Sequence, residues 1–109
     1  MVIVRLKPYL RACTAMGLVE ANMRAIELDV AGAPDAHPMI RGLRGVRKAR
    51  VALPGRGKRW GARVVYYFSV PRAALFMLTA YPKNEQDDLT SDQRRAILAA
   101  LDSIKEVQL

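Results

Sequence analysis

Residues 62–70 read ARVVYYFSV, and the rest of the fold can be built outward from them. This segment is rich in β-branched and aromatic residues, which pack well on a pleated sheet, so it is predicted to be a strand. Residues 46–53 before it alternate as a half-buried strand does, and residues 74–81 after it are mostly apolar. The turns between these segments are short. The three strands are therefore predicted to form an antiparallel meander.

Two short helices are predicted before the meander, at residues 9–16 and 18–30, with Gly17 between them as a helix stop. A β-branched run at residues 2–6 precedes them and fits an edge strand. In the second helix we expect one buried face, formed by Val19, Met23, Ile26 and Val30. The opposite face is expected to be polar and carries Glu20, Arg24 and Glu27. The two helices are expected to cover one side of the sheet as a helical hairpin.

A last helix follows the meander and begins near Thr90, where Thr90 and Gln93 fit a capping box. Its apolar stripe recurs at helical spacing and comprises Ile97, Leu98, Leu101 and Ile104. Together the segments predict an α+β fold that forms a single domain over residues 1–109. The expected order is β-α-α-β-β-β-α, with a small antiparallel β-sheet, an N-terminal helical hairpin and a C-terminal helix.

Composition narrows the class of protein. Apolar residues make up 51% of the 109 residues, which is enough for a modest core. No apolar run approaches the roughly 20 residues that span a bilayer, and the N-terminus lacks the long apolar region of a signal peptide. We therefore expect a soluble, cytoplasmic protein. Cys13 is expected in the core, His37 in a loop, and Asp87 and Asp88 in solvent or at a helix cap. These residues suggest no metal or cofactor.

Positive charge is concentrated in one stretch of the chain. Residues 41–63 contain nine basic residues and no acidic one, namely Arg41, Arg44, Arg47, Lys48, Arg50, Arg56, Lys58, Arg59 and Arg63. In the rest of the chain, ten acidic residues outnumber nine basic ones, although the whole protein carries +8. Such a dense patch repels itself and is stabilised by a polyanion. Nucleic acid or an acidic protein is therefore the expected partner.

Strand alternation divides this basic stretch into two kinds of residue. Lys48, Arg50 and Arg63 are predicted to project from one face of the sheet, while alternate residues such as Val51 and Val64 cover the core. The remaining candidates for RNA binding are Arg47, Arg56, Lys58 and Arg59, with Trp60, Tyr67 and Tyr81 as aromatic residues that can stack on bases. A plain core role with a hydrogen-bonded hydroxyl is the alternative for Tyr66 and Tyr81.

A basic surface of this kind can bind RNA and can also cleave it. RNA supplies its own nucleophile, the 2′-hydroxyl. An enzyme then has to align that group with the phosphorus, stabilise the developing phosphorane and protonate the leaving 5′-oxygen. Arginine and lysine can supply most of this stabilisation. The chemistry requires neither a metal ion nor a histidine.

Several motifs follow one another in the second half of the chain. They read GVRKAR at residues 45–50, PGRGK at 54–58, GARVVYY at 61–67 and YPKNE at 81–85, followed by DLT at 88–90 and the last helix. This set resembles the RelE/ParE toxin superfamily, in particular its HigB-like branch. The resemblance implies the toxin of a type II toxin–antitoxin pair, a ribosome-dependent mRNA endonuclease that cuts messages in the ribosomal A site. It also implies a cognate helix-turn-helix (HigA-like) antitoxin.

The resemblance implies roles for individual residues. Lys48 and Arg50 match the basic pair on the family's second strand, and Arg63 matches the arginine that contacts the scissile phosphate. Lys83 lies where a basic residue of the catalytic groove is expected. These four are the expected catalytic residues, whereas Lys58 matches an RNA-contacting position. No residue of the sequence identifies the general base.

Two other functions are open from the sequence. A ParE-like toxin would poison gyrase through protein contact, although the basic set at Lys48, Arg50 and Arg63 argues against it. A degenerate prophage toxin would bind RNA or the ribosome without cutting. Growth on expression and the pattern of message cleavage distinguish these functions from an mRNA endonuclease.

Overall fold

The computed structural model describes residues 1–54 and 57–106, with the backbone alone for residues 57–60 and 106. Along the described chain the elements are β1 (Val2–Arg5), α1 (Lys7–Ala15), α2 (Glu20–Gly32), β2 (Arg47–Leu53), β3 (Gly57–Ser69), β4 (Ala74–Pro82) and α3 (Ser91–Glu106). The predicted α+β class and element order are confirmed. None of the helices in these ranges has the length and apolar surface that a membrane span requires.

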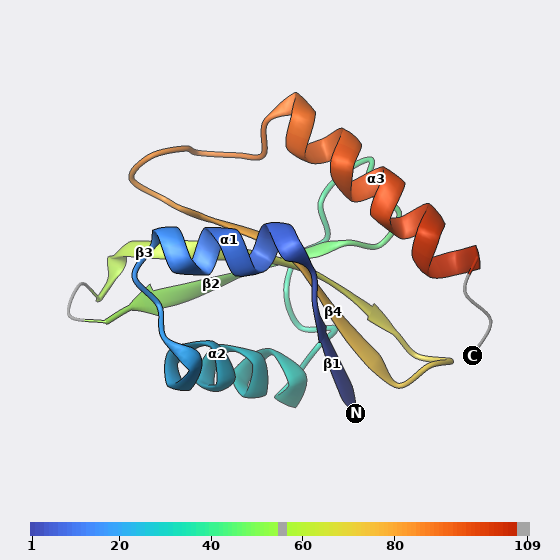
Figure 1. Ribbon diagram of the computed structural model, residues 1–109, viewed down its shortest axis with the longest axis horizontal. Coiled ribbons are helices and arrows are strands. Elements are labelled where there is room, and N and C mark those ends of the chain that lie inside the picture. The colour runs from blue at the N-terminus through green and yellow to red at the C-terminus, as the bar shows by residue number, and fades with distance from the viewer. Residues whose placement is uncertain (55–56, 107–109) are drawn as a thin grey trace.

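The strands lie in the order β1-β4-β3-β2 across the sheet (Figure 1). β2, β3 and β4 form the predicted antiparallel meander. β1 is an edge strand, as expected, but it runs parallel to β4, with Ile3 opposite Leu75. The sheet is therefore mixed rather than antiparallel throughout. Parallel pairing is possible here because two helices and a loop carry the chain from β1 to the far edge before the meander returns it.

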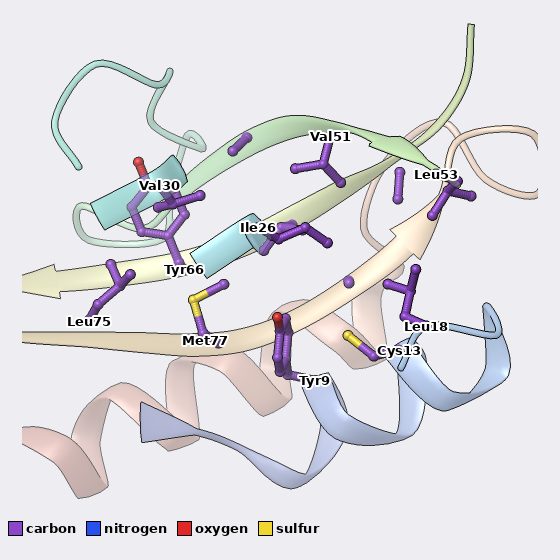
Figure 2. Packing of buried hydrophobic residues seen from close by; sticks show 14 residues of the cluster. Tyr9, Cys13, Leu18, Ile26, Val30, Val51, Leu53, Tyr66, Leu75 and Met77 are labelled. Atoms are coloured by element: carbon purple, nitrogen blue, oxygen red, sulfur yellow. The ribbon is translucent and has the colours of Figure 1, made fainter. Parts of the chain in front are cut away.

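Helices cover both faces of the sheet. α1 and α2 pack with the strands on one face, in a core that includes Tyr9, Cys13, Ile26, Val30, Tyr66 and Met77 (Figure 2). On the other face, α3 and the loop before β2 build a core that includes Ile40, Leu43, Val65, Phe76, Ile97 and Leu101. Figure 1 shows α3 above the strands and α2 below them. This confirms the predicted hairpin and the apolar stripe of the last helix.

Two predicted helix boundaries are set by local hydrogen bonds. Gly17 follows α1 with a φ of +75°, and the amide of Leu18 donates to the carbonyl of Cys13 at 2.9 Å. This is a Schellman-type ending, which favours glycine because of the positive φ. Before α3, the amide of Gln93 donates to Thr90 Oγ1, and the amide of Thr90 donates to Gln93 Oε1. The predicted capping box is confirmed.

The polar face predicted for α2 is wrong at Glu27, which is only 2% exposed. Its carboxylate accepts hydrogen bonds from Arg5 Nε at 2.8 Å and from the Tyr9 hydroxyl at 2.8 Å. These donors come from β1 and α1 and offset the cost of burying the charge, which the periodicity of one helix cannot reveal. Val19, also expected on the buried face, is 60% exposed and precedes α2, which begins at Glu20.

Replacing Glu27 with Gln removes the charge at nearly constant side-chain volume, so Arg5 and Tyr9 lose their shared anionic acceptor. We expect the free energy of unfolding to fall by about 3 kcal/mol, the usual cost of breaking a buried ion pair from one side. Urea unfolding followed by circular dichroism measures the loss. Glu20→Gln removes an exposed acid that also pairs with Arg5, and this control should cost less than about 1 kcal/mol. Equal losses would contradict the buried role of Glu27.

Candidate functional site

The pairing of β2 with β3 brings three basic side chains together. Arg50 is the direct partner of Arg63, and Lys48 is the partner of Val65. Facing residues of an antiparallel pair project to the same side, and alternate residues of a strand share a face. Val65 belongs to the core beneath α3, so the three basic residues lie on the α3 side of the sheet. Ala49, which lies between Lys48 and Arg50 in the sequence, belongs to the core of α1 and α2 on the other side of the sheet.

β4 and the segment after it extend this group. Tyr81 is the direct partner of Arg63 on β4. The amide of Lys83 donates to the carbonyl of Gly61 at 3.0 Å, which continues the strand pairing beyond Pro82. Alternation along the strand assigns Lys83 to the same face as Tyr81. We call the surface formed by Lys48, Arg50, Arg63 and Lys83 the basic face.

The basic face is not neutralised from within the described chain. Across residues 1–54 and 61–105, no ion pair or side-chain hydrogen bond involves Lys48, Arg50, Arg63 or Lys83. Arg50 is exposed, and the other three are half-buried. Like charges directly opposite one another destabilise a strand pair. The charges of Arg50 and Arg63 therefore repel each other in the free protein, and the pair is suited to binding an anion.

Other arginines of the basic stretch are bonded within the fold. Arg44 forms an ion pair with Asp102 of α3 at 2.7 Å. Arg47 donates to the carbonyl of His37 at 2.6 Å and, as the partner of Tyr66, lies on the opposite side of the sheet from the basic face. The structure therefore does not bring Arg47, predicted to bind RNA, to the other candidates.

The other predicted RNA-binding residues stay predictions. Arg56 lies outside the described residues, as do the side chains of Lys58, Arg59 and Trp60. Tyr67 shares the α3 side of the sheet with Arg63 but lies four residues further along β3, which is roughly 13 Å. Its ring packs against Phe76 with a centroid separation of 6.5 Å.

Tyr81 is buried beside the basic face, and this differs from the predicted stacking role. It is 1% exposed and packs in the core beneath α3, so its ring is not available to a base in this conformation. Its hydroxyl is the one buried side-chain polar atom in the described part of the chain that has no hydrogen-bond partner. Burial raises the pKa of Tyr81, the carboxylate of Asp88 raises it further, and the guanidinium of Arg63 lowers it. Sequence reasoning missed this hydroxyl because spacing does not reveal an unpaired atom.

Tyr66 has the core role that was the alternative for both tyrosines. Its hydroxyl donates to the carbonyl of Pro34 at 2.6 Å, and His37 lies edge-on against its ring at 6.1 Å. Cys13 is buried in the core as expected. Asp87 and Asp88 are both exposed, as expected, and Asp88 Oδ1 accepts a hydrogen bond from the amide of Leu89 in the loop before α3. In the described ranges, no three His, Cys, Asp or Glu side chains are grouped to hold a metal ion.

The sequence of residues 17–108 matches a family described as the RelE toxin of the RelE / RelB toxin–antitoxin system. The match spans well over half of the chain. The chain belongs to the RelE toxin family. This confirms the predicted superfamily, while assignment to the HigB-like branch stays a prediction.

Two solved E. coli structures share the RelE fold. A mutant of the E. coli toxin RelE in the free state aligns with a TM-score of 0.57 and 14% sequence identity, covering 92% of this chain and 96% of that one. One chain of the crystal structure of the intact E. coli RelBE toxin–antitoxin complex aligns with a TM-score of 0.51 and 16% identity, covering 73% of this chain and 93% of that one. At such low identity the likeness establishes the fold, and the roles of individual residues need separate support.

Replacing Arg63 with Gln removes one charge of the directly opposed arginine pair. We expect the free energy of unfolding at low ionic strength to rise by roughly 0.2–1 kcal/mol, the usual size of a cross-strand charge effect. The gain should shrink in about 1 M salt, where the Debye length is only about 3 Å. Arg24→Gln is the matched control, because it removes the same charge from α2, where Arg24 pairs with Glu20. A similar rise in the free energy of unfolding in both variants would show that the effect comes from the lower net charge and not from the Arg50–Arg63 pair.

Proposed function

We propose that this RelE-family toxin is a ribosome-dependent mRNA endonuclease that cuts translated messages in the ribosomal A site and so inhibits translation. The observation that carries the proposal is the direct opposition of Arg50 and Arg63. Lys48 and Lys83 lie on the same face, and no described acid pairs with any of the four. Positive charges held together at a cost to the fold favour an anionic substrate, and RNA phosphate matches this charge.

The proposed reaction is attack of the 2′-hydroxyl on the adjacent phosphorus. Arg63 binds the scissile phosphate, and Arg50 across the strand pair helps to stabilise the extra negative charge of the phosphorane. Lys48 and Lys83 flank this pair and favour ionisation of the nucleophile and departure of the 5′-oxygen. A single pre-positioned donor of this kind is worth roughly a hundredfold to a thousandfold in rate. A group outside these four, or water, accepts the proton of the 2′-hydroxyl, and the 5′-oxygen gains a proton as its bond to phosphorus breaks.

The sheet gives the proposed site its rigidity. β2 and β3 fix the positions of Lys48, Arg50 and Arg63 through backbone pairing rather than through contacts among the side chains. The backbone that carries these three residues is therefore already ordered before RNA binds, which lowers the entropic cost of aligning the phosphate. α3 packs on the same side of the sheet.

Arg63→Ala and Lys83→Ala are each expected to abolish growth arrest on expression, with cleavage reduced by at least about a hundredfold. Both side chains are partly exposed, so circular dichroism should show a folded protein. Growth after induction and primer extension on cellular messages measure the effect. Arg24→Ala removes an equal charge from α2 and should remain toxic. A folded Arg63→Ala variant that is as toxic as the wild type would contradict the role of Arg63.

The same primer-extension experiment separates the proposed function from the other two. Cuts inside translated codons are the expected result. Growth arrest with intact messages and inhibited gyrase would instead indicate a ParE-like toxin. Harmless expression with continued co-sedimentation with ribosomes would indicate a non-catalytic remnant.

We infer further that the partner of this toxin is a cognate helix-turn-helix antitoxin of HigA-like type, and that both act in the cytoplasm, where messages are translated. The E. coli RelBE complex pairs a toxin of this fold with its antitoxin. In this chain, the net charge of +8 favours an acidic partner segment and speeds its association.

Co-expression with the protein encoded by the neighbouring reading frame should restore growth, and the two proteins should co-purify at low salt. Because exposed charge pairs are screened by salt, association should slow as ionic strength rises. Surface plasmon resonance at several salt concentrations measures this rate. A neighbouring protein that neither binds nor restores growth would contradict its assignment as the antitoxin.

A further inference from the structure

We propose that the hollow between the end of α1 and the loop after β4 binds one base of the message next to the scissile phosphate, and that the Glu85 carboxylate recognises the edge of that base. The expected base carries an exocyclic amine, as adenine, cytosine and guanine do and uracil does not. The inference rests on the proposed endonuclease function and adds a site of base selection to it. We call this hollow, which Ala15, Met16, Leu53 and residues 84–86 line among others, the loop pocket.

The loop pocket has the size and the kind of surface that a base requires. Its volume of about 320 Å³ lies at the lower end of the roughly 300–1,000 Å³ of small-molecule sites. Met16 and Leu53 give it apolar surface, while Asn84 and Glu85 contribute polar groups. A base has apolar faces and a polar edge, and proteins that recognise single-stranded RNA contact both.

The loop pocket adjoins the basic face at the end of the sheet. Pro82 lines the pocket and is the direct partner of Ala62, the residue before Arg63. Lys83 of the basic face follows Pro82 in the chain, and Asn84 of the pocket comes next. The pocket contacts α1 on the side of the sheet opposite the basic face, so RNA bound to both turns around residues 82–86. Neighbouring residues therefore form the phosphate site and the pocket, as adjacent groups of one RNA strand require.

Hydrogen bonds hold the loop in place before RNA binds. The backbone amides of Glu85 and Gln86 donate to the carbonyl of Pro82 at 3.2 and 3.3 Å. Gln86 Nε2 donates to the backbone carbonyl of Asp88 at 2.8 Å and to Gln93 Oε1 at 3.0 Å, which ties the loop to the cap of α3. A binding loop that is already ordered loses less conformational entropy when its ligand binds.

The carboxylate of Glu85 has no partner within the described fold. Glu85 is exposed, and across residues 1–54 and 61–105 its side chain forms no ion pair. A carboxylate repels phosphate, so its place beside a phosphate site suits a base edge that donates hydrogen bonds. Acidic side chains accept such bonds from the amino groups of bases. Uracil presents its single ring N–H between two carbonyl oxygens, which a carboxylate repels.

The test replaces Glu85 with Gln in the full chain and measures single-turnover cleavage on ribosomes programmed with messages that differ in one base of the A-site codon. Each codon position carries each of the four bases in turn. For the wild type we expect that, at one position, codons with uracil are cleaved about tenfold more slowly than the others, the usual size of one base contact. Glu85→Gln should remove this difference, because an amide can also donate to the carbonyl oxygens of uracil.

Asp87→Asn is the matched control. Asp87 is an exposed acid of the same loop that does not line the pocket, so its replacement removes an equal charge nearby. This variant should keep the preference of the wild type. A preference lost equally in both variants would assign the effect to the local charge and overturn the role of Glu85.

Each other outcome overturns the inference in a distinguishable way. A preference that Glu85→Gln retains would show that another group recognises the base. Cleavage that falls equally for all four bases in Glu85→Gln would show that the pocket binds ribosomal RNA or protein rather than the message. Wild-type cleavage without preference at any position would remove the site of base selection and leave the proposed function intact. No cleavage of any message by the wild type would remove the proposed function itself.

Discussion

The register of β2 against β3 sets two arginines face to face, and the remainder of the candidate site depends on that pairing. Arg50 and Arg63 are direct partners, and backbone hydrogen bonds on both strands prevent either residue from shifting along the sheet. A shift of β2 by one position would turn the Arg50 side chain toward the core of α1 and α2. The repulsion between Arg50 and Arg63 is therefore built into the register of the two strands. An anion bound between the two guanidinium groups would relieve this repulsion.

The two sides of the sheet differ in whether their charged and polar groups have partners within the fold. On the α1 and α2 side, the buried Glu27 is surrounded by donors from Arg5 and Tyr9, and this network ties the edge strand to the helices. On the α3 side, Arg50 and Arg63 have no described partner, and the Tyr81 hydroxyl beside them is also unbonded. Complete pairing of buried polar groups gives a rigid support. Incomplete pairing on the other side leaves polar groups free for a ligand.

α3 lies on the same side of the sheet as the basic face. Its apolar stripe packs over the middle of the sheet, and its Asp102 holds Arg44, an arginine of the basic stretch that precedes β2. The capping box at Thr90 and Gln93 fixes where the helix begins, just beyond the segment that carries Lys83 and Asp88. One helix therefore pairs with one cation of the basic stretch and fixes the end of the loop that follows Lys83. These contacts join parts of the chain that are distant in sequence.

Periodicity and local signals in the sequence were enough to predict the α+β class, the meander, the ends at Gly17 and Thr90, and the common face of Lys48, Arg50 and Arg63. All of these depend on side chains a few residues apart, where the geometry of a strand or helix is nearly constant. The tertiary structure alone decided the parallel pairing of β1, the burial of Glu27 and the unbonded hydroxyl of Tyr81. Each of these depends on atoms from elements far apart in the chain, and the partner available to a buried polar group is known only once those elements have packed.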